Sequence, residues 1–193
     1  MTVMEWIAAL LGVACVALAA MRSVWTFPTA IGSVVLVGVV VFDARLYSDA
    51  LLQGFFVAAN LYGWAGWRAA RARDGEIAVG WMTPASRAAW AIGIVAAALL
   101  WGGAMQRWTD ASYPWWDAAI AAGSVAAQVL MARRRIENWA LWIAVDLASI
   151  PLYLAKGLSM LAALYVVYLA LAIAGLVGWS RPRARSAAGI AAA

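Results

Sequence analysis

Residues 63–67 read Gly-Trp-Ala-Gly-Trp, and residues 175–179 read Gly-Leu-Val-Gly-Trp, so one glycine-tryptophan pattern occurs twice, 112 positions apart. The same offset places Arg22 on Arg134 without a gap. Alanine-rich membrane helices match one another readily, so the glycine-tryptophan triplet and the matching terminal charges carry the comparison. The sequence therefore predicts two related halves, each ending at one of these patterns.

The composition of the chain excludes a water-soluble protein. Of the 193 residues, 67% are apolar and 12% are charged, with a mean hydropathy of +0.85. A soluble domain is about 45–50% apolar and about 25% charged, and a core of this length cannot hide the excess. The chain has no histidine, and its single cysteine is Cys15. Disulfide frameworks, Cys/His metal sites and His-dependent triads are therefore excluded, and we predict no catalytic residue, no metal and no cofactor.

Seven apolar runs are candidate transmembrane helices, since roughly 18 apolar residues cross a bilayer. They are residues 6–21, 23–42, 50–67, 88–106, 118–132, 138–155 and 157–180. Combined with the repeat, they predict an all-α integral membrane protein with seven transmembrane helices in a 3+1+3 arrangement. A single linker helix leaves both halves facing the same way, which is a parallel repeat, and transporters of this plan bind substrate between the halves.

This arrangement divides the chain into five segments. The first repeat is predicted at 1–68, a cytoplasmic loop at 69–87, the linker helix at 88–112, the second repeat at 113–180 and a disordered cytoplasmic tail at 181–193.

The charged residues predict the orientation in the membrane. Of the 14 basic residues, 11 fall on one side of the predicted spans, and the other side has Arg45, Arg107 and Lys156. The positive-inside rule then places the N-terminus outside and the C-terminus in the cytoplasm, in a bacterial inner membrane. Because the arginines stand at span ends with no motif between them, we exclude nucleic acid as a partner. Tryptophans near span ends are predicted to be interface anchors: Trp6, Trp25, Trp108, Trp115 and Trp179.

Asp146 is the only ionisable residue well inside a predicted span. Asn138, Trp142 and Asp146 fall within about 80° of one another on one helix face. This face combines an amide, an indole and a carboxylate, which can stack a planar ring and bind hydroxyls or a positive charge. The alternative is a helix contact in which Asp146 is protonated or paired. Pro151 marks either a hinge or a static bend.

Further pathway candidates lie on the two helices that the repeat makes equivalent, and on the fifth span. They are Gln53, Phe56 and Asn60 on the third span, Tyr165 and Tyr168 on the seventh, and Gln128 on the fifth. Tyr165 and Tyr168 stand at the positions equivalent to Gln53 and Phe56. The alternative for all of them is hydrogen bonding between helices, which contributes about 0.6 kcal/mol per bond in membranes.

The run from Ile136 to Asp146, IENWALWIAVD, followed by Pro151 and Tyr153, resembles the PnuC family of vitamin transporters. The resemblance covers nearly the whole chain except residues 69–85 and the tail. It implies transport of nicotinamide riboside across the bacterial inner membrane and a 3+1+3 fold related to the SWEET sugar transporters. It also implies facilitated diffusion, with the vitamin trapped by a cytoplasmic kinase. Through the family's motif, Asn138, Trp142 and Asp146 would contribute to the vitamin site.

Other functions remain open at this point. Related carriers take thiamine, riboflavin or nucleosides, and thiamine is the first alternative substrate because it is also cationic. A non-transporting membrane scaffold or sensor is the alternative of a different class. An enzyme has little support, because one buried carboxylate without histidine offers no acid–base pair. The expected partners are the vitamin, the lipid bilayer and a functionally linked vitamin kinase, and the sequence is compatible with a homo-oligomer.

Overall fold

The computed structural model describes residues 3–43, 47–110 and 112–181, and the side chains of 5, 41 and 47–51 lie outside the description. The described residues form seven helices: α1 (Val3–Ala20), α2 (Thr26–Asp43), α3 (Tyr47–Asp74), α4 (Pro84–Trp108), α5 (Pro114–Ala132), α6 (Glu137–Ala155) and α7 (Ser159–Ser180). The prediction of an all-helical protein with seven helices is therefore confirmed. The predicted tail from residue 182 onward lies outside the described residues.

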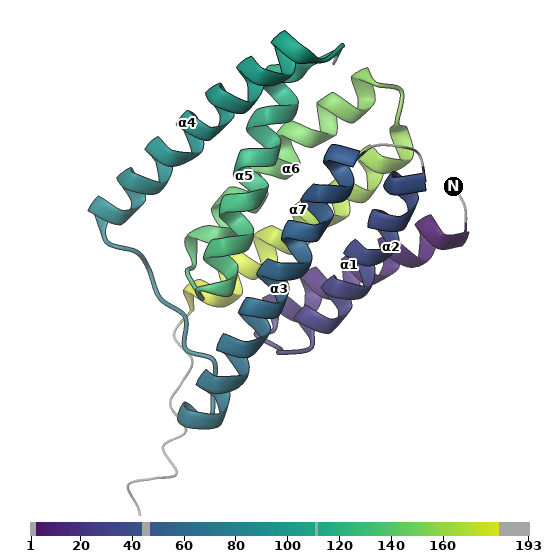
Figure 1. Ribbon diagram of the computed structural model, residues 1–193. Coiled ribbons are helices and arrows are strands. Elements are labelled where there is room, and N and C mark those ends of the chain that lie inside the picture. The colour runs from purple at the N-terminus through teal and green to yellow at the C-terminus, as the bar shows by residue number, and fades with distance from the viewer. Residues whose placement is uncertain (1–2, 44–46, 111, 182–193) are drawn as a thin grey trace, which may run out of the picture.

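Six of the helices form a closed ring. Each packs on its neighbours in the order α1, α2, α3, α5, α6, α7 and back to α1, while α4 packs on α5 from outside (Figure 1). Within the described chain, the backbone of α3 does not approach that of α6 or α7, and α3 meets α7 through the rings of Trp67 and Trp179, 5.7 Å apart between centroids. The two seams between the first three helices and the last three are thus α3–α5 and α1–α7.

Three of the described helices, α4, α6 and α7, are long and apolar enough to cross a membrane. The apolar stretches of α1 and α2, Trp6–Ala20 and Thr26–Val40, are shorter. The arginines at the end of α3 and the polar residues Asp117 and Gln128 of α5 lower the hydropathy of those helices. Length and composition alone thus support three of the seven predicted spans.

The connection between α3 and α4 is shorter than the sequence suggested. Residues 69–87 were expected to form a loop, but α3 continues to Asp74 and α4 begins at Pro84. The reason is that the alanines and arginines after the apolar run are good helix formers. The chain leaves α3 at Gly75, whose φ of +72° suits glycine.

The short segment 75–83 is fixed against the turn between α5 and α6. The Gly80 N–H donates to the Arg134 carbonyl at 3.1 Å, and the Ile136 N–H donates back to the Gly80 carbonyl at 3.1 Å. Ile77 inserts into the buried apolar cluster and is 3% exposed. This segment therefore closes one end of the ring of helices.

Equivalent turns follow α1 and α5. Arg22 and Arg134, 112 positions apart, both have positive φ angles, 57° and 60°. The Arg22 N–H donates to the Ala19 carbonyl at 2.9 Å, and the Arg134 N–H donates to the Met131 carbonyl at 2.8 Å. The sequence repeat thus coincides with a repeated local geometry.

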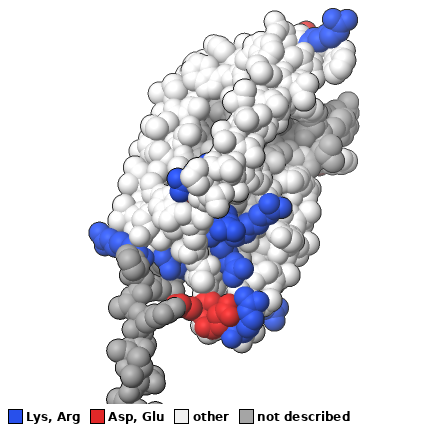
Figure 2. All heavy atoms as spheres, turned by 90° about the vertical axis from the view of Figure 1, so that its left-hand side faces the viewer, with Lys and Arg blue, Asp and Glu red and all other residues white. Residues whose placement is uncertain are grey.

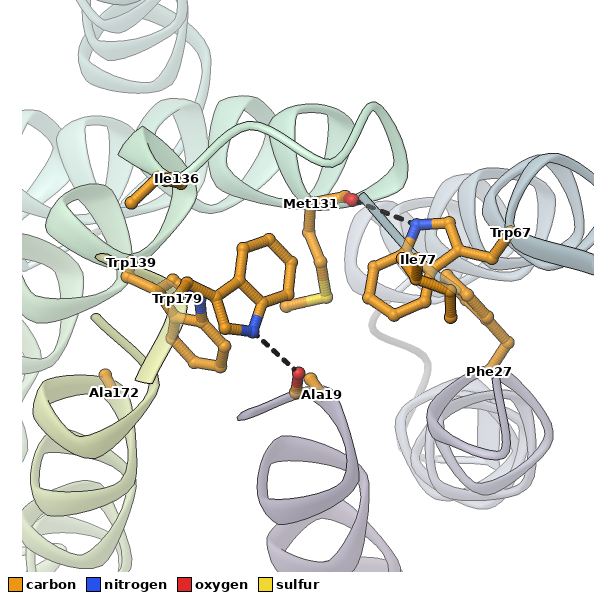
Figure 3. Packing of buried hydrophobic residues seen from close by; sticks show 9 residues of the cluster. All are labelled: Ala19, Phe27, Trp67, Ile77, Met131, Ile136, Trp139, Ala172 and Trp179. Carbon is orange, nitrogen blue, oxygen red and sulfur yellow. Dashed lines mark hydrogen bonds between the residues drawn. The ribbon is translucent and has the colours of Figure 1, made fainter. Parts of the chain in front are cut away.

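Two tryptophans connect the halves reciprocally (Figure 3). Trp67 Nε1 on α3 donates to the Met131 carbonyl at the end of α5, at 3.3 Å, and Trp179 Nε1 on α7 donates to the Ala19 carbonyl at the end of α1, at 3.1 Å. Both donors and both acceptors are related by the offset of 112. Trp179 is 2% exposed, so the prediction that it anchors at the membrane interface is wrong, because its ring packs between the two halves.

The same offset relates two aromatic–glycine contacts. Phe27 of α2 packs against Gly63 of α3, and Trp139 of α6 packs against Gly175 of α7. Phe27 meets the Trp67 ring edge-on at 5.1 Å between centroids, and Trp139 meets the Trp179 ring edge-on at 5.4 Å. The first glycine of each copy of the pattern therefore leaves room for a large ring on the helix backbone.

Candidate substrate pathway

The polar stripe of α6 faces the interior of the bundle. Asn138 is 0% exposed and Asp146 is 3% exposed, while Trp142 is half-buried and packs against the apolar cluster. Ala144 and Leu147 on the opposite face are exposed. Among the described residues no lysine or arginine forms an ion pair with Asp146. The carboxylate thus lies inside the protein rather than against lipid. Ionisable groups at membrane depth that face the interior of a bundle commonly mark substrate or ion pathways.

Three tyrosines, Tyr153 on α6 and Tyr165 and Tyr168 on α7, pack in a row of rings. The hydroxyls of Tyr165 and Tyr168 on α7 lie close enough to Asp146 to interact with its charge. The Tyr165 ring lies 5.0 Å from that of Tyr153 and 5.5 Å from that of Tyr168, between centroids. Tyr168 also reaches α1, where its hydroxyl fills the space that a side chain on Gly12 would need. The structure therefore groups Asp146, Tyr165 and Tyr168.

Asn60 and Gln128 form a second group. Gln128 Nε2 donates to Asn60 Oδ1 at 3.0 Å, and Asn60 Nδ2 donates to the Phe56 carbonyl at 2.8 Å. Both amides are buried, at 4% and 6% exposed, so this bond holds α3 against α5. The positions equivalent by the repeat are Ala172 and Val16, which are apolar. The α3–α5 seam is therefore hydrogen-bonded at this position, whereas the equivalent position of the α1–α7 seam is apolar.

Gln53 and Phe56 are not brought to the Asp146 group, because in the described chain the backbone of α3 does not approach α6 or α7, and α3 meets α7 further along the helix, at Trp67. Gln53 packs beside Gly38 of α2 and lines an open groove of about 380 Å³ between α2 and α3. Phe56 packs against Phe55, with 5.7 Å between ring centroids. The pathway candidates on α3 thus lie apart from those on α6 and α7.

Two buried polar atoms of the α6 stripe have no hydrogen-bond partner in the described chain. They are Asn138 Oδ1 and Trp142 Nε1. Asn138 Nδ2 is held by the Arg135 carbonyl at 2.5 Å, which fixes the amide. A buried polar atom without a partner costs about 1–3 kcal/mol. The stripe therefore offers an acceptor, a donor and a carboxylate to a polar ligand, next to an indole face. No cluster of metal-ligating side chains exists among the described residues.

Tyr153 and Gly12 also contact this group of tyrosines, although neither was predicted as a site residue. Tyr153 lies seven residues after Asp146, which is two helical turns and thus the same face, so continuing the stripe would have found it. Gly12 could not be found, because its contact with Tyr168 joins helices at opposite ends of the sequence.

We expect the Asn60–Gln128 bond to contribute modestly to stability. In a double-mutant cycle with Asn60→Leu and Gln128→Leu, the coupling free energy should be about 0.6 kcal/mol, the average for such bonds in membranes. Reversible unfolding in lipid–detergent micelles measures it. Asn60→Leu combined with Gly93→Ala on α4 should be additive. A coupling of zero between Asn60 and Gln128 would show that the amides act independently.

Comparison with known proteins gives a consistent result. Residues 2–181 match the family described as "Nicotinamide mononucleotide transporter". The chain is similar to the riboflavin/roseoflavin transporter RibM of Streptomyces davaonensis, with 37% identity over 88% of this chain and 81% of that protein. It is similar to the nicotinamide riboside transporter PnuC of Escherichia coli, with 26% identity over 91% of this chain and 85% of that protein.

A solved structure also matches the fold. The crystal structure of the vitamin B3 transporter PnuC aligns with a TM-score of 0.74 and 25% identity, covering 91% of this chain and 80% of that one. This agreement extends over nearly the whole helical bundle. The chain therefore belongs to the nicotinamide mononucleotide transporter family, the PnuC-type family of membrane transporters.

Proposed function

We propose that this protein carries nicotinamide riboside across the bacterial inner membrane by facilitated diffusion. The observation that carries the proposal is the buried Asp146 carboxylate on the same inward face as Trp142 and Asn138. Trp142 stacks the pyridinium ring, and its faces also suit a positive charge. Asn138 binds an amide or hydroxyl, and Asp146 accepts from ribose hydroxyls or faces the pyridinium.

The proposed architecture is the 3+1+3 parallel repeat related to SWEET transporters, with repeats at 1–68 and 113–180 joined through the linker helix at 88–112. The reciprocal tryptophan bonds and the paired turns support it. In this arrangement α4 stands outside the ring and connects two halves of the same orientation. Alternating access then consists of one half rocking against the other around a central site.

Uncoupled transport is the simplest mechanism for this interior. Asp146 is the only charged residue that is buried among the described residues, and a proton relay needs a chain of ionisable groups. Uptake becomes one-way when a cytoplasmic kinase phosphorylates the vitamin, because the added phosphate charge prevents its return. The N-terminus outside and the C-terminus in the cytoplasm put the arginine-rich end on the kinase side.

Riboflavin is the second candidate substrate. It is favoured by the 37% identity with RibM, whose name includes riboflavin and roseoflavin. Riboflavin also combines a flat ring with a hydroxylated arm, so a stripe of indole, amide and carboxylate suits it. It carries no positive charge, however, and this difference separates the two candidates experimentally.

Uptake into liposomes tests the proposal. We expect saturable entry of labelled nicotinamide riboside without any ion gradient, and accumulation above equilibrium only when the matching kinase and ATP are enclosed. Riboflavin and thiamine are measured side by side, and protein-free liposomes are the control. Entry of riboflavin or thiamine alone would change the substrate assignment and leave the transport function in place. If none of the three enters through folded protein, the scaffold or sensor alternative takes the place of the carrier.

A further inference from the structure

A basic pocket lies at the arginine-rich end, outside the substrate pathway. It has a volume of about 580 Å³ and opens where α3, the segment 75–83, α4 and the α5–α6 turn meet. We call it the arginine pocket; its polar lining is Arg133, Arg134, Arg135, Thr83 and Ser86. Seen from the α4 side, basic side chains gather toward this end of the molecule, below a broad uncharged surface (Figure 2). The volume lies in the usual range for ligand sites, about 300–1,000 Å³.

The three arginines of the pocket have few acceptors in the protein. Arg133 lies over the Trp90 ring at 6.0 Å, and Arg135 reaches the Trp81 carbonyl only at 3.4 Å. Within the described chain none of the three forms an ion pair. Three guanidinium groups thus line one pocket without a direct ion pair, and the nearest recorded carboxylate influence is the charge of Asp74 on Arg134.

The repeat explains why Arg134 is available. Its equivalent, Arg22, donates to the carbonyls of Gly178 and Trp179, both at 3.1 Å, where α7 ends. The equivalent carbonyls, those of Gly66 and Trp67, lie inside a helix, because α3 continues to Asp74. The carbonyls equivalent to those that hold Arg22 therefore already take part in helix hydrogen bonds. In the described chain, no hydrogen bond holds the Arg134 guanidinium.

Two acids near the pocket, Glu137 and Asp74, are bound to other groups. Glu137 Oε1 accepts from Arg87 Nε at 2.7 Å and from the Met82 N–H at 2.8 Å. Asp74 is bound by Arg73 at 2.9 Å, and this hydrogen bond lowers the pKa of the Asp74 carboxyl. The pocket therefore keeps a net positive charge. The N-terminus of α4, capped by Thr83, adds its dipole to the same side.

We propose that the arginine pocket binds the phosphate of an anionic phospholipid headgroup. Arginine forks match phosphate oxygens, and basic pockets between transmembrane helices bind anionic headgroups. Trp81, which is 50% exposed, suits the headgroup level. Above it, the outer face of α4 exposes Ile92 at 70% and Leu100 at 77%, a surface for acyl chains. A soluble phosphomonoester offers the same chemistry, so the experiment separates the two sources. The site is independent of which vitamin is carried.

The test uses the full-length protein in detergent and compares three probes: phosphatidylglycerol, phosphatidylcholine with the same acyl chains, and glycerol 3-phosphate. Native mass spectrometry counts bound lipid, and the midpoint of thermal unfolding reports the soluble probe. The pocket variant is Arg133→Gln/Arg134→Gln. The matched control is Arg68→Gln/Arg71→Gln, which removes the same charge from exposed positions outside the pocket. Arg133→Lys/Arg134→Lys keeps the charge and removes the fork geometry, in case the glutamine variant does not fold.

We expect phosphatidylglycerol to bind more tightly than phosphatidylcholine, and its affinity to fall about tenfold or more in the pocket variant, because each charged hydrogen bond contributes at least a factor of about ten. The control variant should bind as the unmodified protein does. If glycerol 3-phosphate raises the unfolding midpoint with the same dependence on Arg133 and Arg134, and phosphatidylglycerol adds nothing, the pocket takes a soluble phosphate. The proposal is overturned if no probe binds, or if both variants lose affinity equally.

Discussion

Asp146→Asn will reduce nicotinamide riboside uptake by about 10- to 150-fold. A hydrogen bond to a charged group contributes about 1.5–3 kcal/mol, and this range of free energy corresponds to the range in affinity. Asparagine keeps the volume of the side chain and removes the charge, so the bundle should stay folded. Relief of a buried charge that has no ion-pair partner should leave the unfolding free energy unchanged or raise it.

The measurement is initial uptake rate against concentration in liposomes, with thermal unfolding of the same preparation. Asp110→Asn is the matched control, because Asp110 is exposed beyond the end of α4 and should transport normally. Riboflavin, if carried, should lose less than nicotinamide riboside does, because it has no positive charge to pair. Uptake that persists in Asp146→Asn, together with a lowered unfolding midpoint, would assign Asp146 to helix packing.

Gly175→Ala should destabilise the bundle by about 1–3 kcal/mol, the usual cost of overpacking. A Cβ at Gly175 would lie 2.6 Å from three ring atoms of Trp139. That ring is fully buried and packs edge-on against Trp179, so it has no room to move away. For a chain of this size, each kcal/mol lowers the unfolding midpoint by about 2–4 °C. Unfolding followed by near-UV circular dichroism in detergent measures the shift.

Gly93→Ala is the control for this substitution. Gly93 lies in α4 with no atom within 4 Å of the added Cβ, so alanine should stabilise the helix by up to about 1 kcal/mol. Gly63→Ala should be destabilising as well, because the added Cβ collides with Phe27 at the equivalent position. Equal unfolding midpoints for Gly175→Ala and Gly93→Ala would mean that Trp139 is free to shift.

Patterns local in sequence predicted much of this structure. The apolar runs indicated the helices, and the spacing of Asn138, Trp142 and Asp146 indicated a common face, which the structure turns inward. The limit of α3 was misplaced because hydropathy detects where apolar residues end, whereas the helix continues through residues with high helix propensity. Gln53 and Phe56 matched the expected stripe, yet the backbone of their helix does not approach α6 or α7, and the helix meets α7 further along, at Trp67.

Features that depend on distant segments could not be predicted. A tryptophan near a span end looks the same in sequence whether its ring is exposed, as that of Trp25 is, or buried in the core, as that of Trp179 is. Only the opposing carbonyl of Ala19 distinguishes the two. The arginine pocket likewise needs the segment 75–83 to fold onto the α5–α6 turn, which no single stretch of sequence encodes.

The indole of Trp67 bonds to a residue 64 positions later in the chain. At a synthesis rate of about 5–20 residues per second, that acceptor follows about 3–13 seconds afterwards. During insertion through the translocon, the indole N–H of Trp67 must therefore bind water or lipid headgroups until Met131 has been synthesised. Ala19 in turn waits for Trp179, 160 positions later, so the nascent chain becomes fully locked only when its final helix enters the bilayer.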